Sequence, residues 1–168
     1  PVDAYFDLGL ADGLATRFQS STFNFDPAGV ERLITDDRCL VGLSDGGAHV
    51  DVICDVGYAT ALLDLWVRKR SVLSLEKAVH KLTQVPATVF GIPDRGVLAE
   101  GKVADLVLFD PATVAARTPR YVHDLPCNGR RLICESEGIR ATFVAGTQLY
   151  DDGRHTGAMP GRILRSYQ

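Results

Sequence analysis

A short apolar run that ends in one carboxylate and two glycines most constrains how this chain can fold. The run covers Cys39–Leu43, and after Ser44 it is followed by Asp45-Gly46-Gly47. Such a run predicts a buried strand that opens into a glycine-rich loop. A lone carboxylate at that point is the usual position of a catalytic group in an α/β barrel. Asp-Gly is also a common turn dipeptide, so a plain turn is the alternative.

Helical signals surround this run, which favours an α/β fold for the first part of the chain. An acid followed by proline, as in Asp26-Pro27, is typical of a helix start. Ser74 is a second capping residue, and Gly91 is typical of a helix end. The predicted helices begin at Pro27, run over Tyr58–Arg70, begin after Ser74, and begin at Pro86.

The second part of the chain carries short β-prone segments separated by turn residues. The predicted strands are Ala104–Asp110, Leu132–Cys134, Ile139–Ala145 and Gln148–Tyr150. The last two strands read as a hairpin, and residues 111–130 read as a long surface connection because they are rich in Pro, Arg and Gly. This change from helical to β-prone segments predicts two domains, 1–94 and 95–168.

Charge and cysteine content exclude several classes of partner. The chain has 168 residues and a net charge of −3, so it presents no basic field for nucleic acid or an anionic membrane. It shows neither an apolar run as long as a membrane span nor a signal peptide, so we expect a cytoplasmic protein. The scattered cysteines predict buried, reduced thiols rather than a zinc cluster. They are Cys39, Cys54, Cys127 and Cys134.

Three segments, in order, resemble the metal-dependent amidohydrolase superfamily, and within it the N-acyl-D-amino-acid deacylases. Gly42–His49 resembles the end of the eighth barrel strand, and Ala78–Gly91 is similar to the helix pair that follows. Arg95–Asp110 resembles the entry into the small β-sandwich and is the most specific of the three. Because the chain starts in mid-pattern at Pro1, we expect a piece of a longer protein.

The resemblance implies the C-terminal part of a (β/α)8 amidohydrolase barrel plus a small β-sandwich domain. It also implies zinc-dependent hydrolysis of a small N-acylated amino acid or related amide, with one or two Zn2+ ions. Zinc lowers the pKa of bound water to about 7, so that a nearby carboxylate can accept its proton.

The family pattern assigns roles to the glycine-rich loop. Asp45 is the expected catalytic proton acceptor and a candidate metal ligand, while Gly46, Gly47 and His49 are the expected substrate-binding residues. A solvated loop histidine is the alternative for His49, and simple flexibility is the alternative for the glycines. Ser44 lies in no nucleophile elbow, so a hydrogen bond to the backbone is expected of it.

Most of the family's metal ligands are missing from this sequence. It has no His-x-His pair, and its histidines are His49, His80, His123 and His155. Since a catalytic zinc takes about three protein ligands, we expect the chain alone to be inactive. The missing N-terminal part of the barrel or a partner chain would supply the rest. The alternatives are another amidohydrolase, of the dihydroorotase or hydantoinase type, and a non-catalytic assembly module.

Overall fold

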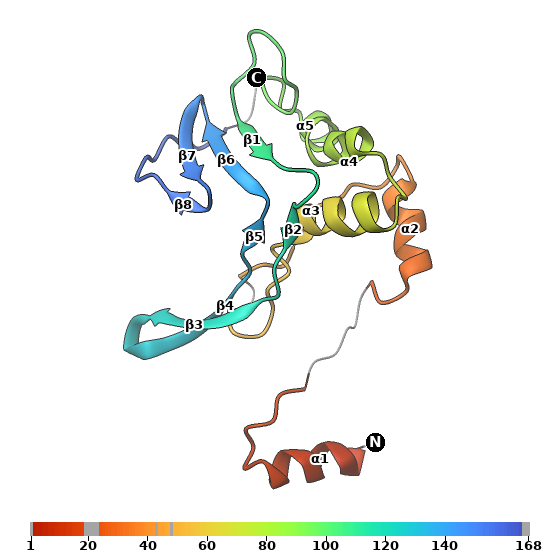
Figure 1. The fold of residues 1–168 in the computed structure, drawn as a ribbon, viewed down its shortest axis with the longest axis vertical. Helices are drawn as coiled ribbons and strands as arrows, with labels where there is room; N and C mark the ends of the chain where they lie inside the picture. Colours follow the sequence, from red (N-terminus) through yellow and green to blue (C-terminus); the bar gives the residue numbers. More distant parts are fainter. Residues whose placement is uncertain (1, 19–23, 43, 48, 166–168) are drawn as a thin grey trace. The chain divides into compact units, whose positions relative to one another are not determined.

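The computed structural model describes residues 2–18, 24–42, 44–47 and 49–165, which form short helices and antiparallel strands (Figure 1). The chain divides into two compact units between Leu33 and Ile34, and each is described by itself. None of the helices in the described ranges has the length and apolarity that crossing a membrane requires. The predicted division at residues 94 and 95 stays a prediction.

The first unit contains α1 (Val2–Ala11) and most of α2 (Pro27–Thr35). Helix α1 ends where Gly13 and Leu14 adopt positive φ angles of 58° and 66°. Both carboxylate oxygens of Asp26 accept backbone N–H bonds from the first turn of α2, each at 3.1 Å. These bonds satisfy donors that the helix itself leaves unpaired. The predicted helix start at Pro27 is therefore confirmed.

The helices of the second unit lie next to one another in the sequence. They are α3 (Tyr58–Ala61), the π-helix η1 (Leu62–Lys69), α4 (Leu75–Leu82) and α5 (Gln84–Val89). The predicted helix over Tyr58–Arg70 is confirmed, with π winding from Leu62 onward. Ser74 begins α4 as predicted, because its Oγ accepts the Lys77 N–H at 3.2 Å. The start predicted at Pro86 is two residues late, and Pro86 lies in the first turn of α5, where no amide donor is needed.

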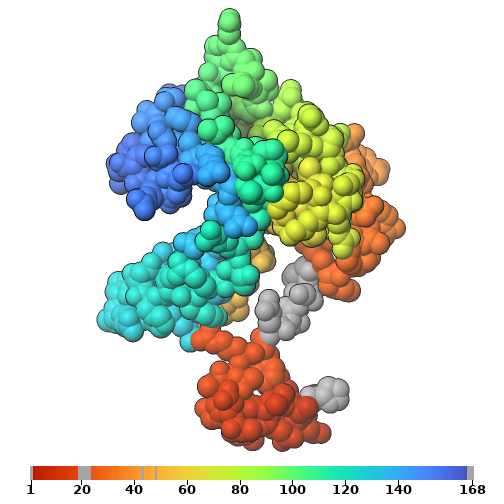
Figure 2. All heavy atoms as spheres, viewed as in Figure 1, coloured from red at the N-terminus to blue at the C-terminus, as the bar shows by residue number. Residues whose placement is uncertain are grey.

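Apolar side chains of η1 and α4 form the core together with the segment around β2. Leu62 and Leu63 are buried, and Ala78 on α4 has no exposed surface. On the strand side, Val114 is 1% exposed. Helix η1 contacts both α4 and β2, and Figure 2 shows the yellow helices in contact with the green β1–β2 segment.

The strands in the described part of the chain form three separate antiparallel groups. They are β1 (Leu106–Phe109), β2 (Ala115–Ala116), β3 (Arg120–Leu125), β4 (Gly129–Ile133), β5 (Ser136–Glu137), β6 (Ile139–Val144), β7 (Thr147–Asp151) and β8 (Arg154–His155). The largest sheet has the order β1-β6-β7-β8, and the other two groups are the pairs β2-β5 and β3-β4. The predicted hairpin is confirmed as β6–β7, but its turn lies one residue earlier than the predicted Gly146-Thr147. The turn residues are Ala145 and Gly146, with φ angles of 49° and 78°.

The strand predicted over Cys39–Leu43 is wrong for Cys39–Gly42, and Leu43 lies outside the described residues. A strand forms only where a neighbour completes its hydrogen bonds, and no described strand pairs with this segment. Its backbone is held by a side chain instead. The buried Nζ of Lys81 donates to the carbonyl oxygens of Asp36 at 2.7 Å and Cys39 at 3.2 Å.

The surface connection predicted over residues 111–130 is also wrong, because this stretch contains β2 and β3. The turn between β3 and β4 is a 3-10 segment, Pro126–Asn128, in which Cys127 has φ 58°. Turn residues therefore mark the tip of a hairpin here, rather than a loop without regular structure.

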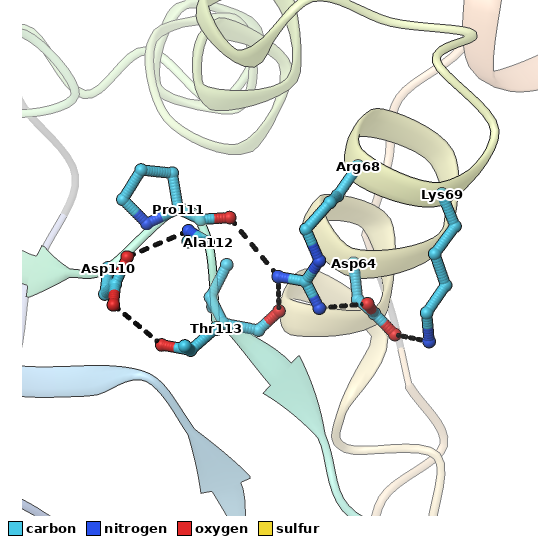
Figure 3. Close-up of polar contacts among 8 residues, drawn as sticks. Asp64, Arg68, Lys69, Asp110, Pro111, Ala112 and Thr113 are labelled. Carbon is cyan, nitrogen blue, oxygen red and sulfur yellow. Dashed lines mark hydrogen bonds and ion pairs between the residues drawn. The ribbon is translucent and has the colours of Figure 1, made fainter.

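Arg68 joins the helices to the strands (Figure 3). One guanidinium nitrogen donates to the carbonyl oxygens of Pro111 at 3.2 Å and Val114 at 2.9 Å. The other forms an ion pair with Asp64 on the same helix. The strand side of this contact is a turn between β1 and β2, which must keep its shape for both carbonyls to face Arg68.

Candidate functional site

Asp45 lies in an irregular loop between α2 and α3, and its side chain is exposed. Its φ is 47°, a left-handed conformation that Asp tolerates better than most residues. Gly47 and His49 also have positive φ values, 92° and 54°. The backbone thus adopts a left-handed conformation repeatedly within a few residues of Asp45. Ala48 lies outside the described residues.

Ser44 and His49 stabilise turns on the two sides of the glycines. The Oγ of Ser44 accepts the Gly46 N–H at 3.2 Å, which confirms the backbone role expected of Ser44. The carbonyl oxygen of His49 accepts the N–H groups of Val52 at 2.7 Å and Ile53 at 3.1 Å. The ring of His49 belongs to an exposed residue, and its role in substrate binding stays a prediction.

The two glycines are needed here for different reasons. A Cβ on Gly46 would lie 2.2 Å from a methyl carbon of Val56, so any side chain would force the loop apart. At Gly47 the space is open, and its φ of 92° is what favours glycine. Both requirements come from the loop itself, and the predicted contact of these glycines with substrate stays a prediction.

A pocket of about 440 Å³ opens beside this loop. One wall is the loop and the other is the end of β4. The lining residues are Gly46, Gly47, Val50, Ile53, Cys54 and Val56 on the loop side, and Arg131, Leu132, Ile133 and Cys134 on the β4 side. The glycines expected at the site therefore line the pocket, and most of the other walls are apolar.

Two polar side chains of the pocket, Arg131 and Cys134, have protein partners. Arg131 donates to both carboxylate oxygens of Asp124, at 2.8 and 2.7 Å, and these bonds lower the pKa of Asp124. Burial raises the pKa of the Cys134 thiol, and the nearby acidic groups Cys54, Asp55 and Glu135 raise it further. The thiol of Cys134 donates to the carbonyl oxygen of Arg117 at 3.1 Å. All four cysteines are free, but the burial that the sequence predicted for the thiols is wrong, because Cys127 is exposed and the other three are half-buried.

The residues present do not by themselves make a zinc site. Within the described ranges, no group of three or more His, Cys, Asp or Glu side chains is placed to hold a metal ion. Structural and catalytic zinc sites need three or four protein ligands. Asp45 is thus at most one ligand of a larger set.

The sequence did not predict that β3 and β4 would border the site. Residues of the β3–β4 hairpin contact Asp51, which lies in the loop after His49. The run Tyr121-Val122 and the turn residues from Pro126 to Gly129 were the available signals for this hairpin.

Comparisons with known proteins agree on one family. Residues 2–150 match the model of the amidohydrolase family. The chain is 43% identical over 146 residues to the N-acyl-D-aspartate deacylase of Alcaligenes xylosoxydans xylosoxydans, covering 84% of this chain and 27% of that protein. The chain therefore spans about a quarter of the length of this curated relative.

Solved structures give the same result. A D-aminoacylase variant in complex with copper chloride superposes with a TM-score of 0.68 at 30% identity, covering 84% of this chain and 28% of that one. The N-acyl-D-glutamate deacylase of Bordetella bronchiseptica, complexed with zinc and a phosphonate mimic of the tetrahedral intermediate, superposes with a TM-score of 0.62 at 36% identity and the same coverage. With a family model matched along most of its length, the chain belongs to the amidohydrolase family.

Proposed function

We propose that this chain is the C-terminal part of an N-acyl-D-amino-acid deacylase and contributes Asp45 to its active site. One observation carries the proposal: in a chain 43% identical to an N-acyl-D-aspartate deacylase, the loop of Asp45 borders a pocket. The substrate class is a small N-acylated D-amino acid. The fold of the whole enzyme is a (β/α)8 barrel with a small β-sandwich, of which this chain supplies the last part.

In the proposed reaction, the carboxylate of Asp45 accepts a proton from the attacking water. The water oxygen bonds to the amide carbon, and the proton then passes from Asp45 to the nitrogen as the C–N bond breaks. The products are a carboxylic acid and a free amine. Gly46 and Gly47 leave the backbone open to the substrate, and His49 contacts the substrate from the same loop.

The proposal includes one or two zinc ions, but this chain does not by itself supply a full set of zinc ligands. Zinc is bound in the Bordetella deacylase to which the chain is similar. Because Asp45 is the one ligand that we assign to this chain, the others come from a preceding part of the barrel or from a partner chain. The four free cysteines fit a reducing, cytoplasmic setting.

The test compares the chain alone with a chimera in which it replaces the matching 146 residues of the Alcaligenes deacylase. Release of free amine from N-acetyl-D-aspartate is measured with added zinc. We expect no turnover by the chain alone and measurable turnover by the chimera. In the chimera, Asp45→Asn should lower kcat at least about 100-fold with little change in KM, as removal of a proton acceptor does.

Asp55→Asn is the matched control, since it removes an exposed acid from the same loop. It should keep the activity of the chimera. Robust turnover by the chain alone would overturn the prediction that its site is incomplete. Full kcat in Asp45→Asn would overturn the proposed role of Asp45. A chimera that cleaves a cyclic amide such as hydantoin, but no N-acyl amino acid, would favour the hydantoinase alternative.

A further inference from the structure

The loop that carries Asp45 is joined to the β3–β4 hairpin at three points. The Leu132 N–H donates to the carbonyl oxygen of Val50 at 2.8 Å. The hydroxyl of Tyr121 donates to the carbonyl oxygen of Asp51 at 3.0 Å. Arg130 donates through Nε and Nη2 to one carboxylate oxygen of Asp51, at 3.3 and 3.2 Å. The hairpin therefore holds two consecutive loop residues by backbone and side chain together.

Arg130 and Tyr121 also contact each other. The guanidinium carbon of Arg130 lies 5.5 Å from the centre of the Tyr121 ring, which is within the range of a cation–π interaction. Since each of the two also bonds Asp51, the three residues form a closed set of contacts across two neighbouring strands and the loop. Removing Arg130 takes away both the ion pair and the ring contact.

The direction of the Leu132 N–H shows where the loop lies. Leu132 stands opposite Tyr121 in the antiparallel pair, and its N–H bonds Val50 on the side away from β3. In an antiparallel pair, successive residues direct their backbone groups alternately toward and away from the partner strand. The neighbours Arg131 and Ile133 therefore face β3, and Val50 covers the outer edge of β4 at Leu132. Figure 1 shows the loop passing beside β4.

The same contact encloses the pocket. One wall consists of Gly46, Gly47, Val50, Ile53, Cys54 and Val56, and the other consists of Arg131–Cys134. Joining Val50 and Asp51 to the hairpin fixes the distance between the two walls. It also fixes one end of the short segment that contains Asp45, Gly46 and Gly47.

We propose that Arg130 is a positioning residue that acts through Asp51 to hold the Gly46–Val56 loop against β4. Its effect on Asp45 and the pocket rests on the proposed function, whereas the docking of the loop does not. Half-exposed on the hairpin, Arg130 itself touches neither the pocket nor Asp45 in the described contacts.

The test is hydrogen exchange of individual backbone amides in the full chain, measured by NMR without substrate. In Arg130→Met we expect the Leu132 amide to exchange about fivefold faster. The loss of an exposed ion pair and a cation–π contact together destabilises the docked loop by about that factor. The amides of Arg131 and Ile133 are internal references, and they should keep their rates. Arg130→Lys should restore most of the Leu132 protection, since a lysine can still pair with Asp51.

Arg140→Met is the matched control, because it removes another exposed ion pair, with Asp152, from a different sheet. It should leave Leu132 unchanged. Unchanged Leu132 exchange in Arg130→Met would overturn the proposal, as would equal acceleration at Arg131 and Ile133. Should Arg130→Met fail to fold, Asp51→Asn tests the same ion pair from the loop side, with the same expected acceleration.

The effect on the reaction is measured in the chimera. If Arg130 positions Asp45, Arg130→Met lowers kcat and Arg130→Lys recovers part of it, whereas an unchanged kcat would overturn this part. Failure of the proposed function is distinguishable, because it would appear as full activity of Asp45→Asn while the exchange of Leu132 still responded to Arg130→Met.

Discussion

At the scale of single residues, Lys81 shows how a buried charge can replace a missing strand contact. Its side chain is 2% exposed, and its Nζ donates to the carbonyl oxygens of Asp36 and Cys39. Both carbonyls belong to the segment that leads into the Asp45 loop. The amine therefore satisfies backbone groups that a neighbouring strand would otherwise satisfy.

We expect Lys81→Met to lower the free energy of unfolding by about 2–4 kcal/mol, because two carbonyl groups lose a charged donor. Chemical denaturation of the two proteins measures the difference. Lys77→Met is the control. Lys77 lies on α4 one turn before Lys81, and it forms an exposed ion pair with Asp37. Such a pair is worth at most about 1 kcal/mol. Equal effects of the two substitutions would show that the buried amine has no special role.

Ala145 has a backbone conformation that is unfavourable for a residue with a Cβ atom. Its φ is 49° at the first turn position of the β6–β7 hairpin, where glycine or asparagine is favoured. Ala145→Gly should therefore raise the free energy of unfolding by about 0.5–1 kcal/mol, seen as a higher Tm. The reverse change at the neighbouring position, Gly146→Ala, should lower the Tm. A lower Tm for Ala145→Gly would contradict the strain argument.

At the scale of elements, the turn between β1 and β2 depends on the charge of Asp110. Its carboxylate accepts the Ala112 N–H at 2.9 Å and the Thr113 hydroxyl at 3.0 Å. These bonds hold the pKa of Asp110 below its ordinary value of 3.8. This turn carries the two carbonyl groups that receive Arg68, so its shape affects the contact between helices and strands.

We expect Asp110→Asn to be less stable than the native chain at neutral pH. A folded-state pKa below the unfolded one gives stability that is present above pH 3.8 and is lost as the pH falls through the folded pKa. The difference between the two proteins should therefore shrink below about pH 3.8. Urea denaturation at a series of pH values measures it, and a difference that stayed constant into acid would contradict the assignment.

Local signals predicted the starts of α2 and α4 because capping is a local interaction, whereas α1 was not predicted. Asp26 and Ser74 bond amides within three residues of themselves, so sequence spacing alone identifies them. The β6–β7 hairpin was predictable for the same reason, although its turn lies one residue earlier than predicted. By contrast, the strand predicted over Cys39–Leu43 depends on neighbours, and no local pattern reports whether a neighbouring strand is present.

The site was predictable only where one segment carries it. Asp45, Gly46 and Gly47 follow one another, and family motifs pointed to them. Arg130 meets Asp51 across 79 residues of sequence, and Tyr121 does so across 70. Each is an ordinary β-strand or surface residue by itself, so a single sequence holds no signal for the contact.

At the scale of the molecule, Arg68 connects the helices to the strands of the second unit. Its guanidinium reaches two carbonyl groups beyond β1 while it pairs with Asp64 on its own helix. On the strand side, β1 lies at the edge of its sheet, and its apolar side chains are exposed on both faces, with Val107 at 58% and Leu108 at 59%.

Arg68→Met should lower the free energy of unfolding by about 2–4 kcal/mol, because two carbonyl groups lose their charged donor and Asp64 loses one of its two cationic partners. Lys69→Met is the control, since Lys69 pairs with the same Asp64 but makes no described hydrogen bond to the strands. Its effect should stay under about 1 kcal/mol. Urea denaturation of both variants measures the difference, and similar losses would mean that the link to the strands contributes nothing.

The π winding of Leu62–Lys69 lets this link tolerate the loss of one residue from the helix. A π turn holds more residues than an α turn, so the helix could rewind as an ordinary α-helix if one residue before Arg68 were deleted. Each residue of an α-helix turns the direction of its side chain by about 100°. Each residue of a π turn rotates the side-chain direction by less, so the lost residue and the tighter winding nearly offset each other. The shortened helix would be better hydrogen-bonded within itself, and its guanidinium would still face Pro111 and Val114.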